Sequence, residues 1–230
     1  MSTVAAPKEA PWHAGLRAAR ANLLPGLALQ AVALGVVLAY YYHAPTHAAL
    51  ARLATLRNEV GVTFSIVSTG LCGGVLPFLY LRFLAGGGTA LGWRHGAFLT
   101  AFWAYKGWEI EMVYRLLAWS VGEGHAPLIV LTKLVLDQFV YCPLFAVPQT
   151  VLAYAWGERN FSTRAILDDV RAPRWYTRRV VPVMISNIGV WVPAAAIIYS
   201  LPTPLQLPLQ NVVLCFFTLL LAHLARQARR

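Results

Sequence analysis

The segment from Leu131 to Pro143, LTKLVLDQFVYCP, lies in one of the most apolar stretches of the chain and yet contains Lys133 and Asp137. A charged side chain at the centre of a membrane helix costs about 2.5 to 3.5 kcal/mol even on the lenient insertion scale. The sequence keeps two charges there despite that cost. We therefore expect Lys133 and Asp137 either to neutralise each other or to serve a function.

The composition of the whole chain is equally apolar. Hydrophobic residues make up 58% of the 230 residues and charged residues only 12%, which is more apolar side chain than one soluble core uses. We therefore predict an all-α integral membrane protein. The net charge of +10 would suit nucleic acid, but the arginines cluster between apolar runs, where they would meet lipid headgroups. We therefore predict that the protein associates with the lipid bilayer and does not bind nucleic acid.

Six apolar segments reach the roughly 20 residues that a helix needs to cross a bilayer. They predict one transmembrane domain over residues 1–230, folded as a compact bundle of about six helices, with 1–58 as an N-terminal extension that carries an extra helix and 59–226 as the main bundle. Prolines inside these segments remove backbone hydrogen bonds, so several helices should be kinked. The segments are residues 22–42, 60–84, 96–121, 127–156, 180–200 and 204–225, and the kinking prolines are Pro143, Pro148 and Pro193.

The basic residues outside the spans are distributed unequally. Apart from Arg52 and Arg57, they fall at the N-terminus, around residues 82–94, in the loop 157–179 and at the C-terminus. Six spans would place all of these on one face, which the positive-inside rule assigns to the cytoplasm. We therefore predict that both termini are cytoplasmic.

The preference for Arg over Lys, with much Ala and Leu, indicates a GC-rich bacterial genome. The N-terminal segment contains Glu9 and two prolines, which is atypical of a mitochondrial transit peptide. The predicted location is the bacterial cytoplasmic (inner) membrane.

The loop 157–179 is the only sizeable polar stretch. Ser162 or Thr163 can cap a short helix that has Ile166, Leu167 and Val170 on one side and Arg and Asp on the other. Such a helix would rest on the membrane surface and contact anionic lipids. The alternative is a solvated basic loop that only sets the topology.

The third predicted span carries four more charges. At about 100° per residue, Lys106 and Glu109 share one face of the helix and Glu111 and Arg115 share nearly the opposite face. With Lys133 and Asp137 the buried charges balance, so they must be paired, hydrated or both. We predict a polar centre between the third and fourth spans, formed by Lys106, Glu109, Glu111, Arg115, Lys133, Asp137 and Gln138.

Gly70 and Gly74 form a GxxxG pair in the second span. Two small residues at this spacing let another helix approach closely. We expect packing within the molecule rather than dimerisation, and the sequence leaves the oligomeric state open.

The residues from Lys133 to Pro143 match K-x-x-x-D-Q-x-x-x-x-P position by position, and in this they resemble the Mpv-type family of mitochondrial inner-membrane and peroxisomal membrane proteins. Gly107, Tyr114 and Leu117 fit three positions of that family's G-P-x-x-H-x-W-Y-x-x-L pattern, but Glu111 replaces its histidine. The resemblance covers about residues 60–225. It implies a compact bundle of membrane helices and, for several members, a proposed pore or metabolite conduit. We also expect Gly107, like Gly70 and Gly74, to pack against a neighbouring helix.

Two functions remain open. The first is a pore or conduit for small solutes or ions through the polar centre, which the kinked helices and the buried charges favour. The second is a non-transporting interaction or structural protein whose charges only pair helices. No hydrolase or metalloprotease motif is present, and the cysteines fall singly in separate segments. We therefore predict no enzyme activity, no metal site and no cofactor.

Overall fold

The computed structural model describes residues 11–84 and 92–227, and throughout these residues it contains helices and no strand. Residues 1–10, 85–91 and 228–230 are outside the described part, and with them Lys8, Arg229 and Arg230 of the predicted topology. In chain order the helices are α1 (Pro11–Ala21), α2 (Leu23–Tyr42), α3 (Ala44–Val60), α4 (Val62–Thr69), η1 (Gly70–Val75), α5 (Leu76–Leu79), η2 (Tyr80–Leu84), α6 (Trp93–Val121), α7 (Pro127–Leu136), η3 (Asp137–Ala146), α8 (Val147–Glu158), α9 (Thr163–Arg171), η4 (Tyr176–Val180), α10 (Val181–Tyr199) and α11 (Thr203–Gln227).

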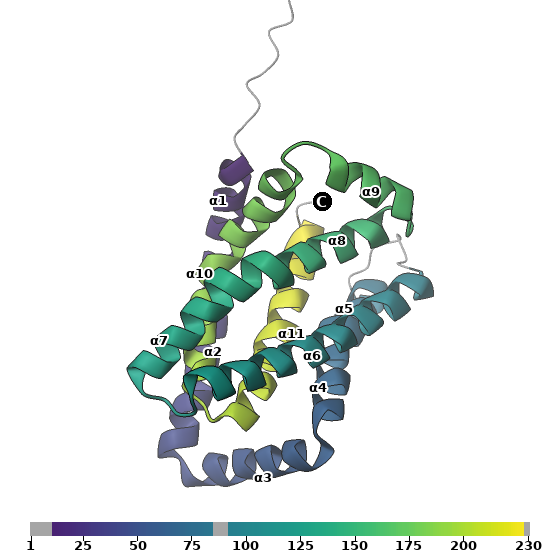
Figure 1. Ribbon diagram of the computed structural model, residues 1–230. Helices are drawn as coiled ribbons and strands as arrows, with labels where there is room; N and C mark the ends of the chain where they lie inside the picture. The colour runs from purple at the N-terminus through teal and green to yellow at the C-terminus, as the bar shows by residue number, and fades with distance from the viewer. Residues whose placement is uncertain (1–10, 85–91, 228–230) are drawn as a thin grey trace, which may run out of the picture.

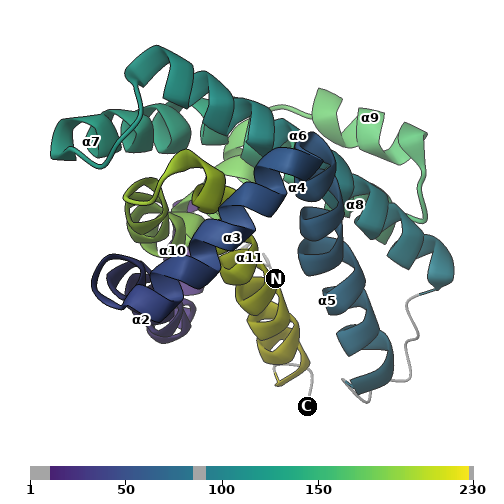
Figure 2. The ribbon, with the colours of Figure 1, turned by 90° about the horizontal axis from the view of Figure 1, so that it is seen from below.

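The long helices run between two ends of the bundle (Figure 1). The short helix α9 lies across one end, together with α1 and the C-terminal end of α11. The helix α3 lies across the opposite end, where the turns between α6 and α7 and between α10 and α11 are also found. Figure 2, which views the bundle from the α3 end, shows the same arrangement.

Four helical stretches are long and apolar enough to cross a membrane, which indicates a membrane protein. They are Leu23–Tyr42, Val62–Phe83, Pro127–Glu158 and Tyr176–Tyr199. The prediction of about six spans is therefore not confirmed. Helix α6 forms as expected, but its central charges lower its hydropathy, and the described apolar stretch of α11, Thr203–Leu219, is shorter than the four.

The segment after the first span is a helix, where the sequence suggested only a loop. Pro45 stands in the first turn of α3, where a proline costs no hydrogen bond. The helix ends at Gly61, which adopts a φ of 65°. Its last turn carries Arg57, whose side chain points into the bundle and is only 4% exposed. An arginine that the sequence placed outside the spans is thus a buried residue.

Wide-turn π-helical segments interrupt the membrane-capable helices close to prolines. Pro143 lies inside η3 and Pro148 follows it directly in α8. Proline removes one backbone donor, and a π-type turn is a common way for a helix to absorb such a break. Pro193 lies inside α10, a helix that is otherwise regular.

The second span packs tightly on α6 through its glycines. A Cβ atom on Gly74 would lie 2.6 Å from the Thr100 Cα, and one on Gly70 would lie 3.3 Å from the Ala104 Cβ. On the facing helix, a Cβ atom on Gly107 would lie 2.2 Å from the Ser65 carbonyl oxygen. All three glycines predicted to pack helices therefore contribute to one interface inside the molecule.

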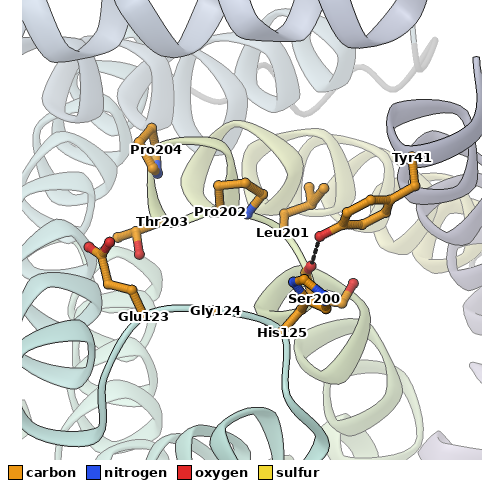
Figure 3. Close-up of a pocket in the computed structure, with 9 residues that line it drawn as sticks. All are labelled: Tyr41, Glu123, Gly124, His125, Ser200, Leu201, Pro202, Thr203 and Pro204. Atoms are coloured by element: carbon orange, nitrogen blue, oxygen red, sulfur yellow. Dashed lines mark hydrogen bonds between the residues drawn. The ribbon is translucent and has the colours of Figure 1, made fainter. Parts of the chain in front are cut away.

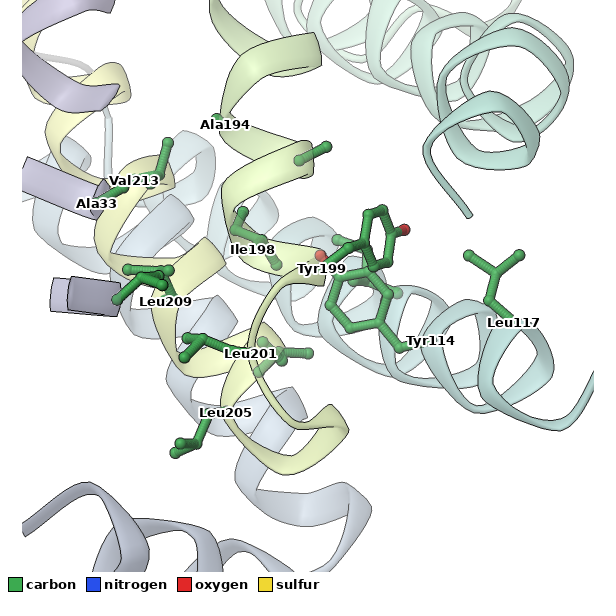
Figure 4. Close-up of a cluster of buried hydrophobic side chains, with 14 residues drawn as sticks. Ala33, Tyr114, Leu117, Ala194, Ile198, Tyr199, Leu201, Leu205, Leu209 and Val213 are labelled. Carbon is green, nitrogen blue, oxygen red and sulfur yellow. The ribbon is translucent and has the colours of Figure 1, made fainter. Parts of the chain in front are cut away.

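The apolar core lies where α2, α6, α10 and α11 meet (Figure 4). Ala33 of α2, Ile198 of α10 and Val213 of α11 are almost completely buried there. The rings of Tyr114 and Tyr199 meet edge to face with centroids 5.5 Å apart. This core fixes α6 and α10 relative to each other, and with them the polar residues that α6 carries.

Candidate functional site

Helix α6 divides the predicted polar centre into two separate sites. Glu111 and Arg115 on one face turn toward α3 and α4, whereas Lys106 and Glu109 turn toward η3 and α8. This follows from their spacing on the helix, which places the two pairs on nearly opposite faces. The structure therefore does not bring all seven predicted residues together.

The first site surrounds the buried carboxylate of Glu111. We call it the Glu111 cluster, and its residues are Arg57, Ser65, Glu111 and Arg115. Oε2 of Glu111 accepts hydrogen bonds from the guanidinium of Arg57 and from the Ser65 hydroxyl at 2.8 Å, and Oε1 accepts one from Nε of Arg115 at 2.7 Å. Glu111 is 2% exposed, whereas the Arg115 side chain is 54% exposed. Both carboxylate oxygens are thus occupied.

Lys106 and Glu109 form the second ion pair, with 2.7 Å between Nζ and Oε2. The ammonium group of Lys106 also donates to the Tyr141 hydroxyl and to Oε1 of Gln149, both at 3.3 Å. The charge of Lys106 is therefore balanced by Glu109, and its ammonium group donates three hydrogen bonds.

Asp137 stands at the first residue of η3 and is 8% exposed. Its carboxylate accepts a hydrogen bond from the Gln138 amide at 3.1 Å, and the Cys142 thiol lies 3.9 Å away. Within the part of the chain that the structure describes, no cation lies within ion-pair distance of Asp137. Its partners are neutral, in contrast to those of Glu111.

Lys133 does not pair with Asp137, although both lie on one continuous helical stretch. Lys133 is 1% exposed, and the acidic group that acts on it electrostatically is Glu123, in the turn between α6 and α7. Side chains lean toward the N-terminus of their helix, so a lysine that precedes an aspartate by four residues leans away from it. Neither residue has an ion-pair partner among the described residues, so the alternative in which Lys133 and Asp137 neutralise each other is wrong.

A cavity of about 470 Å³ opens beside Asp137, and we call it the central cavity. Its walls come from α6, η3, α8, α10 and α11. Most of the lining is apolar or aromatic, and Lys106, Asp137, Gln138, Asn187 and Gln210 supply polar atoms. This volume lies within the roughly 300–1,000 Å³ typical of small-molecule sites.

A smaller cavity of about 340 Å³ lies at the α3 end of the bundle (Figure 3). Glu123 and His125 of the turn between α6 and α7 face Thr203 and Ser200 across it. The Tyr41 hydroxyl donates to the Ser200 carbonyl at 2.6 Å and closes one side. This cavity is formed by turns at the end of the bundle and does not reach the central cavity residues.

Helix α9 begins as the sequence predicts, because the Ala165 N–H donates to the Ser162 hydroxyl at 3.4 Å. Asp169 anchors the helix through Arg159 at 3.0 Å and Arg179 at 3.3 Å. Burial alone would raise the pKa of Asp169, but hydrogen bonds and charge from Arg159 and Arg179 outweigh it and hold the pKa below its usual value.

Sequence reasoning missed Arg57, Ser65, Tyr141 and Gln149 as partners of the charged groups. Two signals were present. Arg57 stands in the most polar part of the chain between the first two spans, and Tyr141 and Gln149 lie at i+4 and i+12 from Asp137. Neither signal says which helices become neighbours, and so neither identifies the partner.

No family model, no curated protein and no solved structure matches the chain. The resemblance to the Mpv-type family therefore stays a prediction.

Proposed function

We propose that the protein is a multi-pass membrane protein that conducts a small solute through the central cavity. The observation that carries this proposal is the cavity itself, of about 470 Å³, with the carboxylate of Asp137 in its wall and, among the described residues, no cation paired with it. An uncompensated polar group at membrane depth is expensive, and such groups are generally found where a substrate or ion passes.

The helix that carries Asp137 supports this proposal. Irregular helical turns at membrane depth are found where the backbone lines a cavity, and η3 runs from Asp137 to Ala146 along the cavity wall. Phe139 and Ile188, which are 60% and 47% exposed, also line the cavity. Its rim therefore reaches the apolar surface, so a solute that partitions into lipid can enter from the side.

Flux through reconstituted liposomes tests this proposal. Thr150 lines the cavity, so Thr150→Trp should fill it and abolish flux of small cationic, neutral and anionic probes that the wild type conducts. Thr55→Trp, on the exposed surface of α3, is the matched control and should conduct like the wild type. Equal flux in Thr150→Trp and the wild type, or no flux above empty liposomes for any probe, would reject the conduit.

We propose six crossings in a bacterial cytoplasmic membrane, with the α9 end in the cytoplasm. The support is that α1, the basic loop 157–179 and the end of α11 share one end of the bundle, and that α3 lies at the other (Figure 1). Helix α6 would cross with Glu111 bonded to α3 and α4 and with Lys106 bonded to η3 and α8. Cysteines at Thr163 and Ala126, in a protein without Cys72, Cys142 and Cys215, should label from opposite sides of the membrane with an impermeant reagent. Labelling from one side contradicts the six crossings.

Helix α9 is proposed to rest on anionic lipid headgroups. Leu167 and Val170 are 46% and 41% exposed beside the exposed side chains of Arg164 and Arg171. An apolar stripe flanked by arginines suits the boundary between headgroups and acyl chains.

The second candidate function is a structural membrane protein that transports nothing. The Glu111 cluster favours it, because Glu111 of α6 is bonded to Arg57 of α3 and to Ser65 of α4 and so holds the three helices together. This candidate predicts wild-type stability for cavity variants and no flux for any solute. The liposome experiment therefore separates the two functions.

A further inference from the structure

We infer that the central cavity binds an amphipathic organic cation, with its positive group at Asp137 and its apolar body against the aromatic wall. This inference deepens the proposed conduit by naming the class of its solute.

The charge that the cavity leaves unbalanced is negative. Lys106 reaches the cavity, but Glu109 neutralises it at 2.7 Å, and the Tyr141 hydroxyl and Gln149 take its remaining hydrogen bonds. Lys133 is not among the residues that line the cavity, and the acidic group that acts on it electrostatically is Glu123. The groups that interact with Asp137 among the described residues are neutral: the Gln138 amide, the Cys142 thiol and the Tyr199 hydroxyl. A buried carboxylate without a counter-charge is stabilised most by a ligand that carries a positive charge.

The lining of the cavity suits a cation with an apolar body. Aromatic rings attract positive charge at their faces and bury apolar groups at the same time. One ring already does so, because Nζ of Lys106 lies 5.5 Å from the ring centre of Tyr141. The rings in the wall are those of Trp103, Tyr114, Tyr141, Tyr154, Trp191 and Phe217.

An anionic ligand finds no counterpart in the wall. Among the side chains that the structure describes, no arginine lines the cavity, and the ammonium group of Lys106 is already paired with Glu109. A small hydrated ion would in turn leave the large aromatic surface unused. The entrance at Phe139 and Ile188 is apolar, which again favours a ligand that partitions into lipid.

Two ions of the same shape and opposite charge test the inference, namely tetraphenylphosphonium and tetraphenylborate. The purified full-length protein should bind the phosphonium more tightly than the borate. Asp137→Asn should weaken phosphonium binding by at least about tenfold, because it removes one member of a buried charge pair. Asp168→Asn, the same change at an exposed position of α9, should leave binding unchanged.

A second measurement needs no variant. In the wild type, phosphonium should protect Asp137 from modification by dicyclohexylcarbodiimide, mapped by mass spectrometry, and borate should not. Absence of phosphonium binding, tighter binding of borate, unchanged binding in Asp137→Asn or lack of protection each overturns the inference.

The outcomes for ligand class and for transport are distinguishable. Flux of uncharged probes that Thr150→Trp blocks, without phosphonium binding, rejects the cation site and leaves the conduit. Phosphonium binding and protection at Asp137 without flux of any probe reject the conduit and leave the cation site.

Discussion

Glu111 and Asp137 are both buried acids on membrane-bundle helices, yet their surroundings differ in kind. The two carboxylate oxygens of Glu111 accept hydrogen bonds from two arginines and a serine hydroxyl. The carboxylate of Asp137 accepts a hydrogen bond from an amide and lies near a thiol, and a cavity of about 470 Å³ lies beside it. Burial alone therefore does not distinguish a structural charge from a functional one. What distinguishes them is whether the fold supplies the counter-charge.

The largest expected effect is at the Glu111 cluster. Glu111→Ala leaves Arg57 buried without its carboxylate, and breaking a buried pair in this way costs about 3 to 5 kcal/mol. The measurement is the free energy of unfolding in detergent. Arg115→Met is the control and should cost far less, because the Arg115 side chain is 54% exposed. Equal losses in the two variants would mean that solvent reaches Glu111.

The close packing that seals this cluster should be almost as sensitive. In Gly107→Ala the new methyl group meets the Ser65 carbonyl oxygen at 2.2 Å, and overpacking of this kind costs roughly 1 to 3 kcal/mol. The matched control is Gly35→Ala in α2, where nothing lies within 4 Å of the new atom. Thermal unfolding of both variants is the measurement, and wild-type stability of Gly107→Ala would contradict the contact.

Asp137→Asn should affect the free energy of unfolding much less than Glu111→Gln does. The Asn variant removes a charge that has no cation and strands no partner, so the free energy of unfolding should change by less than about 1 kcal/mol or increase. Glu111→Gln should be clearly destabilising. A similar large loss in both variants would show that Asp137 is held by a cation after all.

The carboxylate of Asp169 lies outside the membrane-capable helices and should give the smallest effect. Its pKa is lower in the folded protein than in the unfolded chain, so its contribution is complete above the unfolded value, about 3.9, and is lost as the pH falls through the folded value. We expect at most about 1 kcal/mol, because the pair is near the surface. Comparison of acid unfolding with Asp169→Asn measures it, and an identical pH profile would contradict the pairing.

Much of the fold was predictable from the sequence, because local patterns determine it. Apolar length predicted a helix in each of the six ranges, and the pair spacings on α6 predicted Lys106 with Glu109 and Glu111 with Arg115, as the structure has them. The glycine pair predicted a close helix contact within the molecule, and Ser162 predicted the start of α9. Each of these depends on residues a few positions apart.

The tertiary structure alone decided which groups from distant segments meet. Arg57 reaches Glu111 across 54 positions of the chain, and this contact depends on the way α3 folds under the bundle. Lys133 and Asp137 have the spacing of a pair, but the lean of their side chains and the packing of neighbouring helices separate them. The sequence determined that six charges had to be accommodated in an apolar bundle. Only the arrangement of the helices decided that Glu111 is neutralised by arginine and that Asp137 faces a cavity.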